Sequence, residues 1–190
     1  MRRATPLLSV LLLALGAAEA PAASREGVTL PDRLEVGGQD LVLNGLGIRE
    51  ATMFNVNVYV AGLYVKEKTS NPADVIDPKA PKRILMHFVR DVDASDVRGA
   101  YEEGFEKNAG KAYASMKANV KKLNGWMSDM KKGQRMAITY VPGEGTSVSV
   151  QGKTKGTIPG EDFGKVMFTI FFGPKPPNSD LKEGMLGKRK

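Results

Sequence analysis

A run of alternating residues constrains the fold of this chain more than any other segment. Between residues 54 and 65, apolar side chains occupy the even positions up to 60, while the odd positions carry Asn55, Asn57 and Tyr59. A period of two is that of a β-strand, in which successive side chains point to opposite faces of a sheet. The segment therefore predicts a long strand with one aliphatic face and one mixed polar face.

Further strands are predicted on both sides of this run. Residues 34–36 and 40–43 flank Gly37-Gly38, a pair typical of a two-residue hairpin turn. The glycine-containing segment 44–47 is then expected to break the strand pattern. Residues 82–90 are apolar on both alternating faces, which predicts a strand that is covered on both sides.

Helical periodicity marks the segments that follow. Val97, Tyr101 and Phe105 recur at four-residue spacing after a capping position at Asp93 or Ser95. The remaining elements are a short capped helix, a second amphipathic helix, a hairpin, a turn and two C-terminal helices, predicted at residues 70–76, 113–123, 134–151, 152–156, 161–172 and 181–186. This order predicts an α+β domain, with one antiparallel sheet and helices packed on one face.

The beginning of the chain has the order of a cleavable secretory signal peptide. Arg2 and Arg3 precede an apolar run from Leu7 to Leu15, and small residues follow up to Ala23. The apolar run is shorter than the roughly 20 residues that span a bilayer, so a retained membrane anchor is the weaker alternative.

We therefore expect residues 1–23 to be a signal peptide and residues 24–190 to form one domain, with cleavage between Pro21 and Arg25. The expected location is periplasmic or secreted. The sequence has no cysteine, which excludes disulfides, thiolate nucleophiles and a lipoprotein anchor.

The formal net charge of +7 raises the question of an anionic partner. An exported protein rarely meets nucleic acid, and the lysines of the predicted helices are not interleaved with aromatic residues, so we expect a solvated face there and no nucleic-acid binding. Weak contact with an anionic membrane surface is the remaining possibility. We expect a monomer.

The sequence gives little sign of cofactor or metal chemistry. Gly45-Leu46-Gly47 lacks the third glycine and the acidic partner of a dinucleotide-binding fingerprint, and nucleotide, hydrolase and zinc-protease motifs are missing. His87, the only histidine, lies in a predicted strand and is expected to be a hydrogen-bonded structural group. We expect no cofactor, no metal and no catalytic residue.

Arg49 is the most informative polar residue. It follows a glycine-rich segment and precedes the alternating strand that presents Tyr59. A guanidinium held among sheet residues suits a carboxylate, to which a nearby phenol would donate a second hydrogen bond. The alternative is a structural salt bridge with Glu50 or Asp40. Composition and spacing leave both possibilities open.

Four segments together resemble the chalcone isomerase superfamily, and more narrowly its bacterial, exported chalcone-isomerase-like branch. They lie at residues 43–49 (Leu-Asn-Gly-Leu-Gly-Ile-Arg), 58–65, 156–159 and 171–173. The resemblance extends from about Gly27 to Gly187. It implies an open-faced β-sandwich, a large antiparallel sheet under a layer of helices, with a ligand cleft between the two layers.

The resemblance also implies roles for individual residues. In the plant isomerases an arginine steers the phenolate of a flavonoid, and a strand threonine orders a water beside the reacting ketone. Arg49 matches the arginine, but Tyr59 stands at the threonine position. The family's fatty-acid-binding proteins keep the arginine and carry tyrosine there, so Arg49 with Tyr59 resembles a pair that holds a lipophilic carboxylate.

Two more positions follow from the same comparison. The isomerases use a tyrosine and an asparagine seven residues apart on the first long helix, which Tyr101 and Asn108 match. Counting from the helix cap at Asp93 instead gives Val97 and Gly104, one turn earlier. A hydroxyl-bearing residue of the isomerases aligns with Ile170, which has no hydroxyl.

Three hypotheses follow. The favoured one is a non-catalytic, exported protein that binds a fatty acid or similar lipophilic carboxylate through Arg49, Tyr59, Tyr101 and Asn108. The alternatives are an isomerase or intramolecular lyase for a flavonoid-like substrate, with Arg49 as electrostatic stabiliser, and a scaffold without a ligand. Five apolar residues are candidates for a tunnel lining or for plain core: Phe105, Met116, Met167, Phe168 and Phe171.

Overall fold

A seven-stranded antiparallel sheet forms the centre of the computed structural model, which describes residues 22–51 and 56–189. The predicted leader up to residue 21, and Phe54 and Asn55 of the alternating run, lie outside the described residues. The strands follow chain order across the sheet: β3 (Arg33–Val36), β4 (Gln39–Ala51), β5 (Val56–Val65), β6 (Lys82–Phe88), β7 (Arg135–Val141), β8 (Gly145–Val150) and β9 (Lys153–Ile158).

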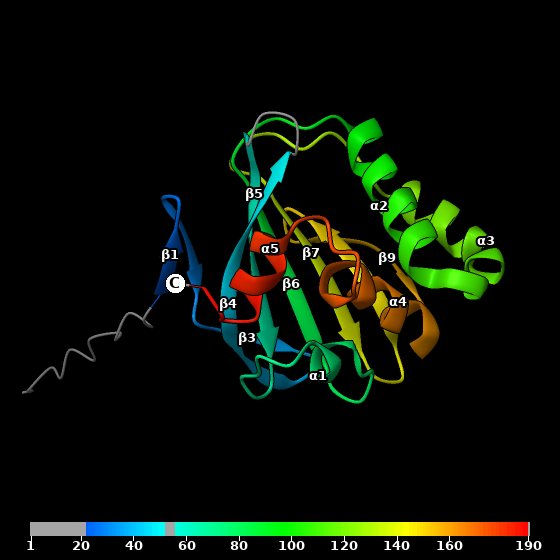
Figure 1. Cartoon of the computed structure of the whole chain (residues 1–190), viewed down its shortest axis with the longest axis horizontal. Coiled ribbons are helices and arrows are strands. Elements are labelled where there is room, and N and C mark those ends of the chain that lie inside the picture. Colours follow the sequence, from blue (N-terminus) through cyan, green and yellow to red (C-terminus); the bar gives the residue numbers. More distant parts are fainter. Residues whose placement is uncertain (1–21, 52–55, 190) are drawn as a thin grey trace, which may run out of the picture.

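Helices cover one face of this sheet, and a small hairpin lies on the opposite side of β4 and β5 (Figure 1). The hairpin consists of β1 (Ala22–Arg25) and β2 (Val28–Pro31). The helices are α1 (Pro72–Ile76), α2 (Ala94–Ala109), a 3-10 turn (Gly110–Ala112), α3 (Tyr113–Asn124), α4 (Glu161–Phe172) and α5 (Ser179–Met185). The predicted α+β class is confirmed, with one antiparallel sheet and a layer of helices on one face.

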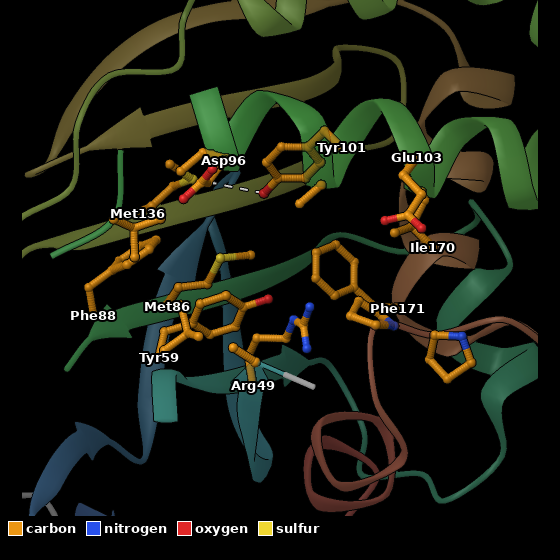
Figure 2. Close-up of a pocket in the computed structure, with 18 of the residues that line it drawn as sticks. Arg49, Tyr59, Met86, Phe88, Asp96, Tyr101, Glu103, Met136, Ile170 and Phe171 are labelled. Carbon is orange, nitrogen blue, oxygen red and sulfur yellow. Dashed lines mark hydrogen bonds between the residues drawn. The ribbon is translucent and has the colours of Figure 1, made fainter. Parts of the chain in front are cut away.

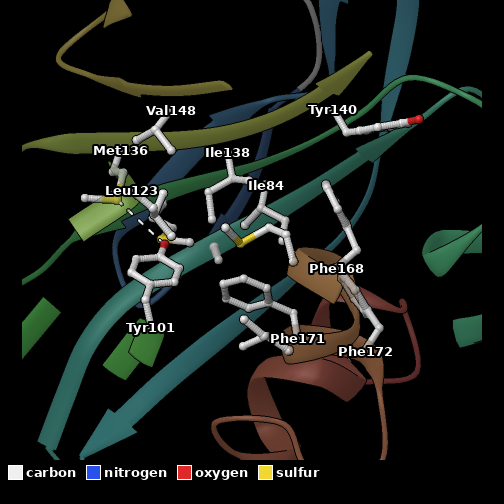
Figure 3. Close-up of a cluster of buried hydrophobic side chains, with 14 of the residues drawn as sticks. Ile84, Tyr101, Leu123, Met136, Ile138, Tyr140, Val148, Phe168, Phe171 and Phe172 are labelled. Carbon is white, nitrogen blue, oxygen red and sulfur yellow. Dashed lines mark hydrogen bonds between the residues drawn. The ribbon is translucent and has the colours of Figure 1, made fainter. Parts of the chain in front are cut away.

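The main core lies between the helices and the inner face of the sheet. Leu63, Ile84, Ile138 and Val148 are partners in register on four consecutive strands. Figure 3 shows Ile84, Ile138 and Val148 of this row on the strands, with Phe168, Phe171 and Phe172 of α4 packed on the same side. Residues that face each other across antiparallel strands point to the same side of a sheet, so this row buries a continuous aliphatic strip.

The predicted helices are present with their predicted buried faces. Asp93 is the N-cap residue of α2, and Val97, Tyr101 and Phe105 are its buried positions. In α3 the buried residues are Met116, Val120 and Leu123, and the basic residues of this region are exposed, at Lys111, Lys117, Lys121, Lys122, Lys131 and Lys132. No helix in the described part of the chain is long and apolar enough to cross a bilayer.

Three predictions about the strands were wrong. Residues 44–47 do not end a strand: β4 continues through them to Ala51, with an irregularity in its pairing after Leu43. Residues 153–158 form β9, where a turn was expected to extend to residue 156. The outer face of β6 is only half-buried, because the β1–β2 hairpin covers β4 and β5 and does not reach across the whole sheet.

The glycines of β4 are explained by helix α5, which packs directly on the strand backbone. A Cβ atom on Gly47 would collide with the carbonyl oxygen of Leu181, and one on Gly45 would collide with that of Gly184. Asn44 fixes the same contact: its amide nitrogen donates to the carbonyl of Met185 at 2.8 Å and to that of Thr69 at 2.9 Å. The glycine pattern thus serves close packing of a helix on a strand rather than a turn.

Replacing Gly47 should therefore destabilise the fold. Gly47→Ala forces the backbones of β4 and α5 apart, and we expect a loss of about 3 kcal/mol in the free energy of unfolding, the upper end of overpacking costs. Gly99→Ala is the matched control: an exposed glycine in α2 with open space at its Cβ, where alanine should add up to about 1 kcal/mol. Urea denaturation of both variants measures the difference. Equal stabilities would contradict the packing.

Candidate ligand-binding site

A cavity of about 580 Å³ lies between the inner face of the sheet and helix α2 (Figure 2). Its floor includes Arg49 from β4, Tyr59 from β5, and three apolar residues of β6 and β7, namely Met86, Phe88 and Met136. Val97, Tyr101 and Gly104 of α2 line the opposite side. Ile170 and Phe171 of α4, with the segment 175–177 that follows it, complete the wall.

The register of three strands brings the polar pair together. Arg49 is the partner of Tyr59 across β4 and β5, and Tyr59 is the partner of Phe88 across β5 and β6. The rings of Tyr59 and Phe88 contact each other, with centroids 5.4 Å apart and a tilt of 55°. The three side chains therefore form one row on the inner face, with the cation at one end and an aromatic wall at the other.

The contacts that hold Arg49 in place come mainly from its own strand. Its guanidinium donates a hydrogen bond to the carbonyl oxygen of Glu50, and the side chain is half-buried. Within residues 22–51 and 56–189, no carboxylate forms an ion pair with it, so the alternative of a salt bridge with Glu50 or Asp40 finds no partner there. A buried or half-buried cation without a counter-ion favours an anionic ligand.

Both tyrosines of the cavity are hydrogen-bond donors at neutral pH. Burial raises the pKa of Tyr59 to about 12, although the positive charge of Arg49 opposes this shift. Burial also raises the pKa of Tyr101 well above its usual value, and the neighbouring Tyr59 adds to the shift. Both phenols therefore keep their protons over the whole physiological range.

The structure separates the two possible assignments on α2. Tyr101 lines the cavity, but Asn108 does not; Val97 and Gly104 both do. The amide of Asn108 instead donates to the carbonyl of Gly104 at 2.9 Å and to that of Lys175 at 3.2 Å.

Asn108 thus fastens the segment 173–178 that forms one wall of the cavity. Asn178 holds the other end of this segment, donating to the carbonyl of Ile48 at 2.9 Å. The backbone next to Arg49 is therefore tied to the same wall that Asn108 secures.

Charged residues of both signs surround the cavity. Glu103 pairs with Lys107 along α2, and Asp91 pairs with Lys131 at 3.1 Å, while Asp93 and Asp96 lie at the start of α2. No group of three or more acidic or histidine side chains in the described residues is arranged to hold a metal ion.

His87 lies on the outer face of the sheet, away from the cavity. It is half-buried, and its Nδ1 accepts a long hydrogen bond of 3.4 Å from Arg135. Burial and the charge of Arg135 lower the pKa of His87.

Sequence reasoning missed much of the apolar lining. Of the five proposed tunnel residues only Phe171 lines the cavity, while Phe105, Met116, Met167 and Phe168 belong to the packed core. Met86 and Phe88 stand on one face of the predicted strand 82–90, so the alternation contained a signal for them. The Lys175-Pro176-Pro177 segment carried no signal, because its place depends on where α4 ends and on the two asparagine contacts.

A family model described as chalcone isomerase-like matches residues 22–187. The chain belongs to the chalcone isomerase-like family. Among solved structures, a fatty-acid binding protein of Arabidopsis thaliana has the same fold, with a TM-score of 0.73 at 15% sequence identity, over 87% of this chain and 96% of that one. No curated protein sequence matches the chain.

The raised pKa of Tyr59 predicts a specific alkaline destabilisation. The unfolded chain loses this proton near pH 10 and the folded protein near pH 12, so unfolded molecules bind fewer protons in between and stability falls as pH rises. Tyr59→Phe should remove that part of the fall, measured by urea denaturation at intervals from pH 9 to about 11.5. Phe105→Leu, a change in the core outside the cavity that removes no titratable group, is the control and should leave the fall unchanged. In a pH titration of the folded protein, the tyrosinate absorbance that is present in the wild type and missing in Tyr59→Phe should develop near pH 12. If it develops near pH 10, the shift is contradicted.

Proposed function

We propose that this protein is a non-catalytic binding protein for a fatty acid or similar lipophilic carboxylate. The observation that carries the proposal is the pairing of Arg49 with Tyr59 on the cavity floor, beside the apolar side chains of β6 and β7. The guanidinium supplies charge and a planar pair of donors, and the neutral phenol supplies one more hydrogen bond. A carboxylate is the group that this arrangement fits best.

The rest of the cavity suits the tail of such a ligand. Met86, Phe88 and Met136 on the sheet face Ile170 and Phe171 of α4 across the space. The volume of about 580 Å³ lies within the range of small-molecule sites. Flexible methionines adapt to a chain that has several conformations. The name of the Arabidopsis protein with the same fold, a fatty-acid binding protein, supports the same ligand class.

Two residues favour binding over isomerisation. Tyr59 and Ile170 stand where the resemblance to the isomerases implies a threonine and a hydroxyl-bearing residue, and both line the cavity of this protein. The phenol of Tyr59 is larger than a threonine hydroxyl and reaches toward Arg49, which leaves the pair arranged to hold an anion.

We also propose that the protein acts outside the cytoplasm, as an exported bacterial member of the family. The order of charged, apolar and small residues up to Ala23 supports export, and a periplasm supplies membrane-derived fatty acids more readily than flavonoids. Purification from the periplasm should give a mature chain that begins between Pro21 and Arg25, which intact-mass spectrometry would establish. A chain that retains Met1 would contradict export by cleavage.

Loss of the Arg49 charge should weaken ligand binding. Native mass spectrometry of protein from its own compartment should show a bound fatty acid, and Arg49→Gln should bind it about 10- to 100-fold more weakly, the loss expected for one charged hydrogen-bonding group. Calorimetric titration with octadecanoate measures the change. Arg98→Gln, an exposed arginine on the solvent side of α2, removes the same charge outside the cavity and should leave affinity unchanged.

Three results would decide against the proposal. Equal weakening by Arg49→Gln and Arg98→Gln would show that net charge alone attracts the ligand. An empty protein whose Arg49→Gln variant only loses stability would favour a scaffold. Cyclisation of a chalcone that Arg49→Gln abolishes would favour the isomerase.

A further inference from the structure

The solvent face of helix α3 carries only lysines and small residues. Its exposed positions are Ala114, Ser115, Lys117, Ala118, Lys121 and Lys122. The edge strand β9 exposes Lys153, Thr154, Lys155 and Thr157. Neither element contains an acidic residue, and none of these five lysines forms an ion pair with a residue in the described part of the chain.

Helix α3 and strand β9 are joined by a tryptophan that follows the helix. The ring of Trp126 packs so closely on Gly156 that a Cβ atom there would collide with it, yet the indole is only half-buried. Lys122 donates from Nζ to the carbonyl oxygen of Thr157 at 3.4 Å and lies 5.6 Å from the centre of the Trp126 ring. The five lysines and Trp126 therefore belong to one surface, which we call the α3–β9 surface.

The α3–β9 surface is separate from the ligand-binding cavity. None of its five lysines lines the cavity, and Trp126 does not line it either. Helix α3 is attached to the other side of α2, where Asn124 donates to Glu102 at 3.4 Å and the hydroxyl of Tyr113 donates to Glu106 at 3.2 Å. Figure 1 shows α3 at the end of the domain opposite to the β1–β2 hairpin.

We propose that the α3–β9 surface docks the protein on an anionic phospholipid bilayer. The proposal goes beyond the proposed function and does not depend on it, because it concerns a different surface. All five cations are lysines, whose compact charge and long apolar stem suit a fluid layer of head groups. Bidentate recognition of single phosphates, including those of nucleic acid, would favour arginine, which this surface lacks. A partly exposed indole is suited to the boundary between lipid and water.

Vesicle binding by the full mature protein tests this proposal. Vesicles of equal parts phosphatidylglycerol and phosphatidylcholine should sediment with the protein at about 0.1 M salt, whereas vesicles of phosphatidylcholine alone should not. Trp126 is the only tryptophan of the chain, so a blue shift of its fluorescence reports contact of this surface with lipid. Sedimentation without a blue shift would place the contact elsewhere and overturn the proposal.

A double variant removes one lysine from each element. Lys121→Gln with Lys155→Gln should bind the mixed vesicles about 25-fold more weakly, since each lysine near an anionic bilayer contributes about fivefold. Lys66→Gln with Lys68→Gln is the matched control, which removes the same charge from exposed positions after β5. Lys68 lines a pocket beside the β1–β2 hairpin, far from α3, so the control should bind as the wild type does.

Three results would overturn the docking surface. Equal weakening by the two double variants would show that net charge alone attracts the protein. Equal binding to both kinds of vesicle would show that the lysines play no part. Tighter binding to a double-stranded oligonucleotide than to the mixed vesicles would assign the surface to nucleic acid. The affinity for octadecanoate should be unchanged in Lys121→Gln with Lys155→Gln, so failure of vesicle binding leaves the proposed function intact.

Discussion

The contact between helix α5 and strand β4 is the constraint on which the binding cavity depends. Gly45 and Gly47 let the helix backbone lie against the strand, and the segment that leads into α5 is held by Asn178, whose amide donates to the carbonyl of Ile48. Arg49 is the next residue of the strand. The packing that stabilises the end of the chain therefore also fixes the charge of the site and the wall at residues 175–177.

The register of the sheet places the other residues of the cavity floor relative to Arg49. Arg49, Tyr59 and Phe88 form one row, and Met86 with Met136 belong to the next. The period of two puts these residues on the inner face, and the rows become less polar from Arg49 toward Met86 and Met136. A cation on this face would be costly in a dry core, but at the edge of a cavity it costs less and attracts an anion.

The sequence correctly predicted the elements that depend on local pattern. The predictions were wrong or incomplete where contacts between distant segments determine the structure. Alternation located β5 and the inner residues of β6, and helical spacing located the buried face of α2. The glycines at 45 and 47 predicted a break because their signal is the same for a turn and for a helix packed on a strand. Spacing alone also left two registers on α2, since Asn108 and Gly104 lie one turn apart, and only the fold shows that Asn108 contacts the 173–178 segment.

The distribution of charge around the cavity gives the ligand a direction. The cation of the floor is Arg49, whereas Asp93 and Asp96 lie at the start of α2, on the opposite side of the space. A ligand carboxylate is therefore attracted to Arg49, although Arg90 and Lys107, which also line the cavity, offset part of the negative charge at α2. The site consequently favours an anionic head group at Arg49 and Tyr59, with the rest of the ligand against the apolar residues of β6, β7 and α4.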